Sequence, residues 1–192
     1  MRLILRRRTA TLFAVTAALA VVMCGCVPEE PLPSAAPTST RGEAPFATDD
    51  DALAAAQKTY EEFMAVANQI MAEGGASPER LDAIAAPELA AAEKEGIDDF
   101  AARKLTVDGS STVSAAKLQS YTPDAKDGLA IVRAYFCINV SAVDVLDENG
   151  ASAVQPTRPD TTPFEVVFDL DEYDPPHLIV SAKTVWGGEG IC

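Results

Sequence analysis

Apolar side chains recur at spacings of three and four residues between positions 49 and 75. They are Leu53, Ala56, Tyr60, Phe63, Met64, Ala67, Ile70 and Met71. Because an α-helix has 3.6 residues per turn, this spacing places them on one helix face. The helix is expected to begin near Asp49 or Asp50, either of which can cap it, and to end at Gly74-Gly75.

Two more helices are expected before residue 105. Ser77-Pro78 predicts a short one, with Ser77 as the cap and proline in the first turn. Pro87 opens a longer one over the sequence PELAAAEKEGIDDFAARKL, in which Gly96 is a weak point or a break. The first part of the folded chain is therefore expected to be helical.

The pattern changes to alternation after Leu105, which is typical of strands. Four strands are expected, within residues 105–121, 129–147, 163–170 and 177–186. A turn at Asp108-Gly109 could precede the first of them. Helices followed by strands indicate an α+β fold, with N-terminal helices packed on a four-stranded sheet. Because little helix remains for parallel crossovers, the sheet should be antiparallel.

The second strand has one wholly apolar face, which we assign to the core. That face holds Ala130, Val132, Ala134, Phe136, Ile138 and Val140. The opposite, outward face holds Ile131, Arg133, Tyr135, Cys137, Asn139 and Ser141.

The first 25 residues have the organisation of an export signal. Arg2, Arg6, Arg7 and Arg8 precede an apolar stretch from Thr9 to Met23. A positive start followed by an apolar segment of this length is typical of secretory signals. We therefore assign residues 1–25 to a signal peptide and exclude them from the fold.

The end of this segment resembles the lipobox of bacterial lipoproteins. Cys26 follows the small residue Gly25, with Met23 at the aliphatic position, whereas Cys24 follows the bulky Met23. The resemblance implies that Cys26 becomes the first mature residue and is acylated, anchoring the chain to the outer face of the cell membrane. Two alternatives stay open. One is an uncleaved membrane anchor, for which residues 12–27 are short, and the other is an ordinary cleaved signal.

Residues 26–48 are expected to form a tether. They include Pro28, Pro31, Pro33, Pro37 and Pro45. Prolines at this density prevent a helix, and the surrounding Ser, Thr and Ala supply no core. The tether, about 65 Å long over residues 27–47 if fully extended as polyproline, would lift a single domain over residues 49–192 off the lipid surface.

Two cysteines follow the signal, Cys137 and Cys192. An even number of thiols outside the membrane suggests a disulfide, and two allow a single intramolecular pairing. We therefore expect the C-terminal tail to lie over the outward face of the sheet, where Cys137 should point.

The chain is strongly acidic, with a formal net charge of −14. From Cys26 onward it carries 29 acidic and 11 basic residues, a formal net charge of −18. Such a surface repels nucleic acid, so a nucleic-acid partner is not expected. The sequence contains no phosphate loop, dinucleotide fingerprint or zinc spacing, and no cofactor is expected.

Three helices before a long antiparallel sheet resemble the nuclear-transport-factor-like cone fold, which includes ketosteroid-isomerase-like and SnoaL-like domains. The segments YFCINVSAVDVLDENG and VWGGEGIC are similar to secreted lipoproteins of high-GC Gram-positive bacteria that carry such a domain. The resemblance covers residues 49–192 and implies a curved, cone-like sheet around a pocket. Members of this fold include enzymes, ligand binders and assembly modules, so the fold alone does not give the function.

Four aromatic residues are candidates for lining that pocket: Tyr60, Phe63, Tyr135 and Trp186. A core role on the helix stripe is the alternative for Tyr60. Cone-fold isomerases use an Asp as base, and no catalytic Asp can be placed in this sequence. The single histidine, His177, could act as a base, although an exposed strand end is the simpler interpretation.

The segment DLDEYDPP is dense in carboxylates, which can hold calcium. It lacks the spacing of an EF-hand loop, so a solvated acidic loop is favoured and no metal site is expected.

We expect a membrane-anchored exported lipoprotein whose domain is a non-catalytic module of the cell envelope. It would bind a small apolar ligand in the pocket or an envelope protein on the sheet. The alternative is a pocket enzyme of the isomerase, cyclase or hydratase type, which would place a buried Asp or His beside a pocket Tyr. A third hypothesis is pairing of domains through an exposed apolar patch at Ile131 and Tyr135.

Overall fold

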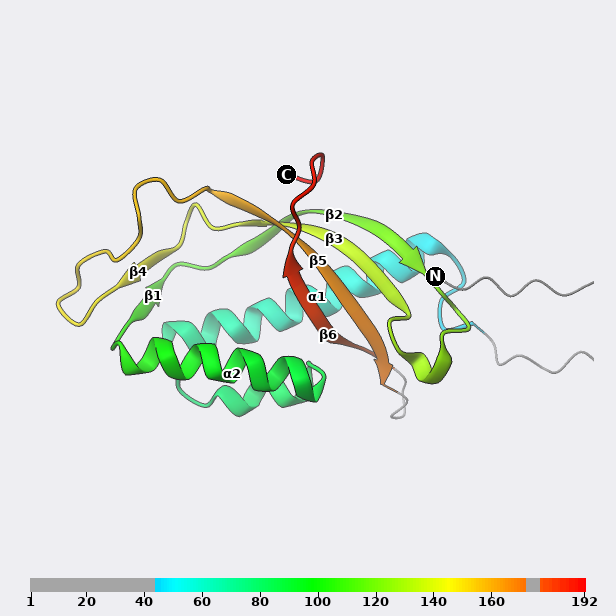
Figure 1. The fold of residues 1–192 in the computed structure, drawn as a ribbon, viewed down its shortest axis with the longest axis horizontal. Coiled ribbons are helices and arrows are strands. Elements are labelled where there is room, and N and C mark those ends of the chain that lie inside the picture. Colours follow the sequence, from blue (N-terminus) through cyan, green and yellow to red (C-terminus); the bar gives the residue numbers. More distant parts are fainter. Residues whose placement is uncertain (1–43, 172–176) are drawn as a thin grey trace, which may run out of the picture. The chain divides into compact units, whose positions relative to one another are not determined.

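A computed structural model describes residues 44–171 and 177–192 (Figure 1). Residues from Arg41 to Cys192 form one compact unit. The expected signal peptide, Cys26 and most of the tether lie outside the described residues, as does most of the acidic loop. None of the helices in the described part of the chain combines the length and the apolarity needed to span a bilayer.

The first helix, α1, spans Asp49–Ala72, as the apolar stripe predicts. Its cap is Thr48, whose hydroxyl accepts a hydrogen bond from the Asp51 N–H at 3.1 Å. The prediction that Asp49 or Asp50 caps the helix is therefore wrong. Both instead occupy the first turn, where their charges favour the positive end of the helix dipole.

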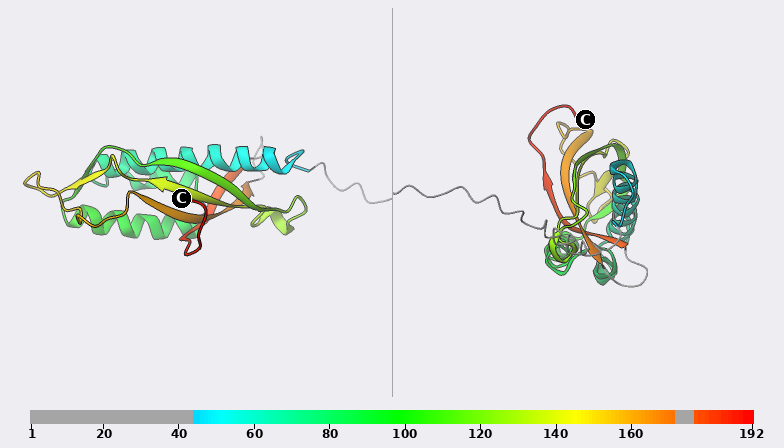
Figure 2. Two further views of the ribbon diagram at one scale, coloured as in Figure 1. Left: turned by 90° about the horizontal axis from the view of Figure 1, so that it is seen from above. Right: turned by 90° about the vertical axis from the view of Figure 1, so that its right-hand side faces the viewer.

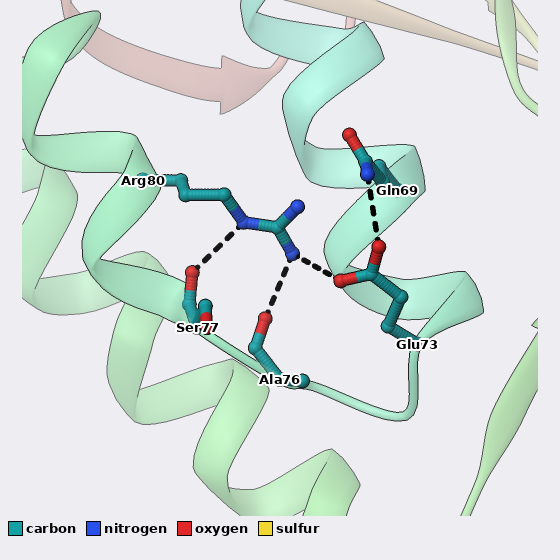
Figure 3. Close-up of polar contacts among 5 residues, drawn as sticks. All are labelled: Gln69, Glu73, Ala76, Ser77 and Arg80. Atoms are coloured by element: carbon teal, nitrogen blue, oxygen red, sulfur yellow. Dashed lines mark hydrogen bonds and ion pairs between the residues drawn. The ribbon is translucent and has the colours of Figure 1, made fainter.

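A short 3-10 helix, η1, spans Pro78–Ala83. Ser77 precedes it in the left-handed conformation, at φ 55°, and makes no capping hydrogen bond, so the predicted Ser77 cap is wrong. Arg80 instead closes the connection from α1. It donates to the backbone carbonyls of Ala76 and Ser77 and to the Glu73 carboxylate, and Gln69 donates to the same carboxylate (Figure 3).

The third helix, α2, spans Pro87–Ala102. It runs through Gly96 without a break. A Cβ added at Gly96 would meet nothing within 4 Å, so this glycine leaves the helix intact and serves no close packing contact.

The sheet has four antiparallel strands in the order β2-β3-β5-β6. The strands are β2 (Thr112–Tyr121), β3 (Val132–Asn139), β5 (Thr161–Asp171) and β6 (His177–Val185). A separate two-stranded sheet pairs β1 (Thr106–Asp108) with β4 (Asp144–Leu146), also antiparallel. The α+β class and the antiparallel four-stranded sheet are thus confirmed.

The strand expected over residues 129–147 is wrong as a continuous element, because it divides into β3 and β4. The break coincides with the turn predicted at Asp108-Gly109 on the neighbouring strand. Gly109 has φ +82°, and a Cβ there would lie 1.9 Å from the carbonyl oxygen of Ala142. The two backbones approach so closely that the ladder is interrupted on both strands.

The inward face of β3 is largely as expected. Val132, Ala134, Phe136 and Ile138 are buried in the core. Ile131 is also buried, although the alternation placed it on the outward face. The reason is Ala130, which has φ 52° and shifts the alternation just before the strand begins.

The helices α1 and α2 and the sheet enclose one hydrophobic core (Figure 1). Helix α1 contacts β2, β3 and β6, whereas α2 packs against β6 and η1. The largest fully buried side chains are Phe63, Phe136, Phe168, Ile70, Leu81, Ile131, Val132, Val166 and Val180. They come from α1, η1, the residue before β3 and three of the four strands, so the core joins both layers.

The two edges of the sheet differ. Beside β6, the N–H of Ala86 donates to the Val180 carbonyl at 2.8 Å, and the N–H of Val180 donates to the Ile84 carbonyl at 3.1 Å. This segment thereby continues the sheet as a single parallel bridge. The β2 edge has no such cover among the described strands, and its pairing with β3 is interrupted by two irregularities.

Cys137 and Cys192 form the expected disulfide, with Cα atoms 5.1 Å apart. The C-terminal tail therefore lies against the outer face of the sheet, on the side away from α1 (Figure 2). Cys137 is only 2% exposed.

Candidate functional site

A cavity of about 320 Å³ lies between α1 and the inner face of the sheet. Its lining residues come from α1, three strands and three loops. They are Tyr60, Phe63, Met64, Ala67, Ser111, Ile138, Val140, Arg158, Thr162, Phe164 and Lys183. The middle of the cavity is mostly apolar, with Thr162 beside Ile138, and its charged groups lie at the two ends.

Tyr60 is the most deeply buried polar residue of this lining, with 3% of its surface exposed. Its ring packs against Phe136 and Phe63, at centroid distances of 4.6 Å and 6.0 Å. No group among the described residues hydrogen-bonds its hydroxyl. Every fully buried polar side-chain atom in the described residues has a hydrogen-bond partner, so the Tyr60 hydroxyl is not fully buried. The hydroxyl must therefore reach the cavity.

Electrostatics keep Tyr60 protonated. Burial, and to a lesser extent the nearby Glu93 carboxylate, raises the pKa of its phenol well above the ordinary range. At physiological pH the group is a neutral hydroxyl that can donate one hydrogen bond and accept another.

Lys183 and Glu93 form an ion pair at the Tyr60 end of the cavity. The Lys183 Nζ lies 3.0 Å from the Glu93 Oε2 and 5.3 Å from the centroid of the Phe63 ring. Both side chains are about three-quarters buried. The pair joins α2 to β6 and carries no net charge.

Arg158 lies at the opposite end. Its Nη2 donates to the carbonyls of Val140 and Val143, at 2.9 Å and 2.7 Å, which holds the chain where β3 has ended. No carboxylate among the described residues pairs with this guanidinium. Ser111 is nearby and is fixed by Asn68 of α1, whose Oδ1 accepts from the serine hydroxyl at 2.8 Å.

The two polar ends are well separated. On α1 the lining runs from Tyr60 to Ala67, which is a rise of about 10 Å. The wall between them is Phe63, Met64, Ile138 and Phe164. The site thus has a neutral polar end, an apolar middle and a cationic end.

The four aromatic candidates do not come together. Tyr60 and Phe63 line the cavity, whereas Tyr135 and Trp186 pack together on the outer face of the sheet, at a centroid distance of 4.7 Å. The Tyr135 hydroxyl accepts from Gln119 at 2.6 Å. Ile131 is buried, so the expected apolar patch at Ile131 and Tyr135 is not present.

His177 lies outside the cavity. It begins β6 with its side chain half exposed, and its Nε2 is 4.0 Å from Asp171 Oδ2. Among the described residues that line the cavity there is no Asp, Glu or His. In the described part of the chain, no group of three or more His, Cys, Asp and Glu could hold a metal ion.

A second, more open groove of about 420 Å³ adjoins the small sheet. Apolar residues of α1, α2, β1 and β4 line it together with Arg103, Gln155 and Arg158. Arg158 is the residue that the two spaces share.

Sequence reasoning missed Arg158, Lys183 and Glu93. Lys183 was missed because strict alternation places Ala182 and Thr184 with Val180 on the inner face of β6, and therefore places Lys183 on the outer face. The structure pairs Phe168 with Val180 but Val167 with Ala182, so one residue is skipped and Lys183 turns inward. Arg158 comes from a loop, for which alternation carries no information.

Comparison with known proteins gives the fold alone. No family model matches this chain, and no curated protein matches it. Among solved structures, the intermembrane space region of the chloroplast protein ARC6 is similar, with a TM-score of 0.50 and 13% identity over 71% of this chain and 97% of that one. A de novo designed β-sheet protein has a TM-score of 0.33 and 14% identity, covering 73% of this chain and 92% of that one.

Proposed function

We propose that this chain is an exported lipoprotein, anchored at Cys26 to the outer face of the cell membrane. Its folded unit is a non-catalytic module that binds a small, largely apolar ligand in the cavity between α1 and the sheet. The anchor is supported by the charged and apolar start of the sequence and by Gly25-Cys26.

The observation that carries ligand binding is the Tyr60 hydroxyl. The hydroxyl reaches the cavity without being engaged by another described side chain, so it is available to hydrogen-bond a ligand there. Tyr60 is 3% exposed, lines the cavity and has no partner among the described residues. A ligand with one hydrogen-bonding group would satisfy it.

The size of the cavity limits the ligand. At about 30 Å³ per water molecule, a volume of about 320 Å³ is that of about ten waters. Ligands of about ten non-hydrogen atoms fit this space. We also propose that the sheet wraps around α1 in the cone-like manner of nuclear-transport-factor-like domains, which is the arrangement that best explains a cavity lined by α1 and three strands.

The enzyme alternative has weaker support. An isomerase, cyclase or hydratase needs a positioned acid or base within reach of its substrate. The described lining offers Tyr60 without an Asp or His, and the charged groups nearest to it, Lys183 and Glu93, are engaged in an ion pair with each other.

Intact mass of the protein extracted from its own membranes tests the anchor. A chain that begins at Cys26 with added acyl mass is expected. Cys26→Ser should lose the acyl mass, whereas the matched variant Cys24→Ser should keep it. An unacylated chain that begins elsewhere would refute the anchor.

Native mass measurement of the same material tests the cavity. A co-purifying small molecule is expected with the unaltered chain and with Ala54→Phe, on the exposed face of α1. Ala67→Phe should remove it by filling the cavity. Equal retention by both variants would place the ligand elsewhere and reject this function.

A further inference from the structure

We infer that the cavity selects a small amphipathic carboxylate, held with its carboxylate at Arg158 and its apolar chain between α1 and the sheet. This inference rests on the proposed ligand-binding function and adds the chemical class of the ligand. It follows from a difference between the two ends of the cavity: the charge of Lys183 is neutralised by Glu93, whereas the charge of Arg158 is not neutralised by a described carboxylate.

The Tyr60 end is electrically balanced. Lys183 lies in the lining, but Glu93 neutralises it at 3.0 Å. The Tyr60 phenol stays protonated and neutral. This end can accept a chain terminus or a hydroxyl group, and it offers no net charge to an ion.

The Arg158 end is not balanced. Both of its hydrogen bonds leave from Nη2 and go to backbone carbonyls, which do not cancel a full charge. No carboxylate in residues 44–171 or 177–192 pairs with it. The remaining donors, on Nε and Nη1, lie on opposite edges of the guanidinium, so either can donate a single charge-assisted hydrogen bond to a carboxylate oxygen.

The negative charge of the chain sets Arg158 apart as a local site of attraction for an anion. With a formal net charge of −14, the protein repels anions over most of its surface. A half-buried guanidinium therefore acts locally, where the lower dielectric strengthens its attraction for an anion.

The apolar stretch between the ends sets the shape of the ligand. Phe63, Met64, Ile138 and Phe164 line a path of about 10 Å between the Tyr60 and Arg158 ends. An unbranched chain of moderate length, such as that of octanoate, matches both this path and a volume of about ten non-hydrogen atoms.

Arg158 also holds the end of β3 through Val140 and Val143, so its removal affects structure as well as charge. The first comparison therefore uses no variant. Equilibrium dialysis of the full chain in lipid nanodiscs, with empty nanodiscs subtracted, measures binding of radiolabelled octanoate, octan-1-ol and octylamine. Octanoate should bind roughly tenfold more tightly than octan-1-ol, as expected for a gained charge-assisted hydrogen bond, and octylamine should bind most weakly.

Two variants then locate the preference. Arg158→Gln should bring octanoate binding down to that of octan-1-ol, while Arg103→Gln, which removes an exposed charge from the neighbouring groove, should leave it unchanged. A third variant, Tyr60→Phe, removes only a hydroxyl without a described partner. Because octanoate would place its methyl end there, the variant should leave octanoate binding nearly unchanged and should not lower the melting temperature.

The outcomes separate the two proposals. Equal binding of octanoate and octan-1-ol, both lost in Ala67→Phe, would overturn the carboxylate preference and leave the cavity function intact. A preference for octanoate that persists in Arg158→Gln would also overturn it. Failure of all three probes to bind the unaltered chain would reject the ligand-binding function together with the inference.

Discussion

The hydroxyl of Tyr121 bonds both backbone polar groups of Phe46. It accepts from the Phe46 N–H at 3.0 Å and donates to the Phe46 carbonyl at 3.1 Å. The two rings also meet edge to face, with centroids 5.6 Å apart. The chain that leads into α1 is thereby held against the end of β2.

Tyr121→Phe should free this segment and lower the free energy of unfolding by about 1 kcal/mol, the net value of an ordinary hydrogen bond. Urea unfolding measures the loss, and hydrogen exchange should become faster at the Phe46 amide. The control is Tyr135→Phe, whose hydroxyl bonds the exposed Gln119 and whose loss should be smaller. Unchanged exchange at Phe46 would show that the hydroxyl does not hold the segment.

Loss of the Cys137–Cys192 disulfide should lower the free energy of unfolding substantially. The bond closes a loop with a sequence separation of 55, for which the chain-entropy relation gives about 4 kcal/mol. Urea unfolding of Cys192→Ser should show this loss, and reductant should shift the unaltered protein toward the variant without shifting the variant itself. An unaltered chain whose midpoint does not change after verified reduction would contradict the prediction.

Gly109→Ala should be far more damaging than Gly150→Ala. Both glycines have positive φ, at +82° and +78°. An alanine held in this left-handed conformation costs about 1–2 kcal/mol, so both substitutions should be destabilising. A Cβ at Gly109 would in addition collide with the Ala142 carbonyl, whereas at Gly150 it meets nothing within 4 Å. Thermal unfolding of the two variants should differ clearly, and equal losses would show that the close approach is unimportant.

Glu73 should make stability depend on pH in the acid range. Hydrogen bonds from Gln69 and then from Arg80 lower the pKa of its carboxyl below the ordinary 4.5 (Figure 3). A lowered folded-state pKa adds stability that is present above 4.5 and is lost as the pH falls through the folded-state value.

Urea unfolding at a series of pH values tests this contribution. Glu73→Gln should be less stable than the unaltered chain at neutral pH, and the two curves should converge in acid. Glu79→Gln is the matched control on η1, because Glu79 has no such set of hydrogen bonds among those described. A constant difference at every pH would rule out the titration of Glu73.

Much of the fold follows from periodicity. The stripe from Leu53 to Met71 predicted α1, and the alternation in β3 predicted which of its residues enter the core. These apolar patterns repeat over several helical turns or strand residues, so a single exception does not change the prediction.

Single backbone conformations caused the failures. Ala130 at φ 52° turned Ile131 inward, and one skipped residue in β6 turned Lys183 inward. The irregularity at Ser181 reverses the facing of the β6 residues beyond it, whereas the conformation of Ala130 changes only Ile131, before β3 begins. Neither alanine nor serine is a residue type from which such a change can be predicted. The cationic end of the cavity depends on a loop arginine, Arg158, whose position is decided by tertiary contacts to Val140 and Val143.

The bridge from Ile84 and Ala86 to Val180 has a consequence for proteins crowded on a surface. Lipid anchoring at Cys26 would confine many copies to two dimensions, where open strands of neighbouring molecules meet often. The bridge occupies backbone groups on the β6 edge, and the irregular pairing of β2 spoils the regular spacing that strand addition requires. The sheet is thus guarded against edge-to-edge polymerisation at both of its margins.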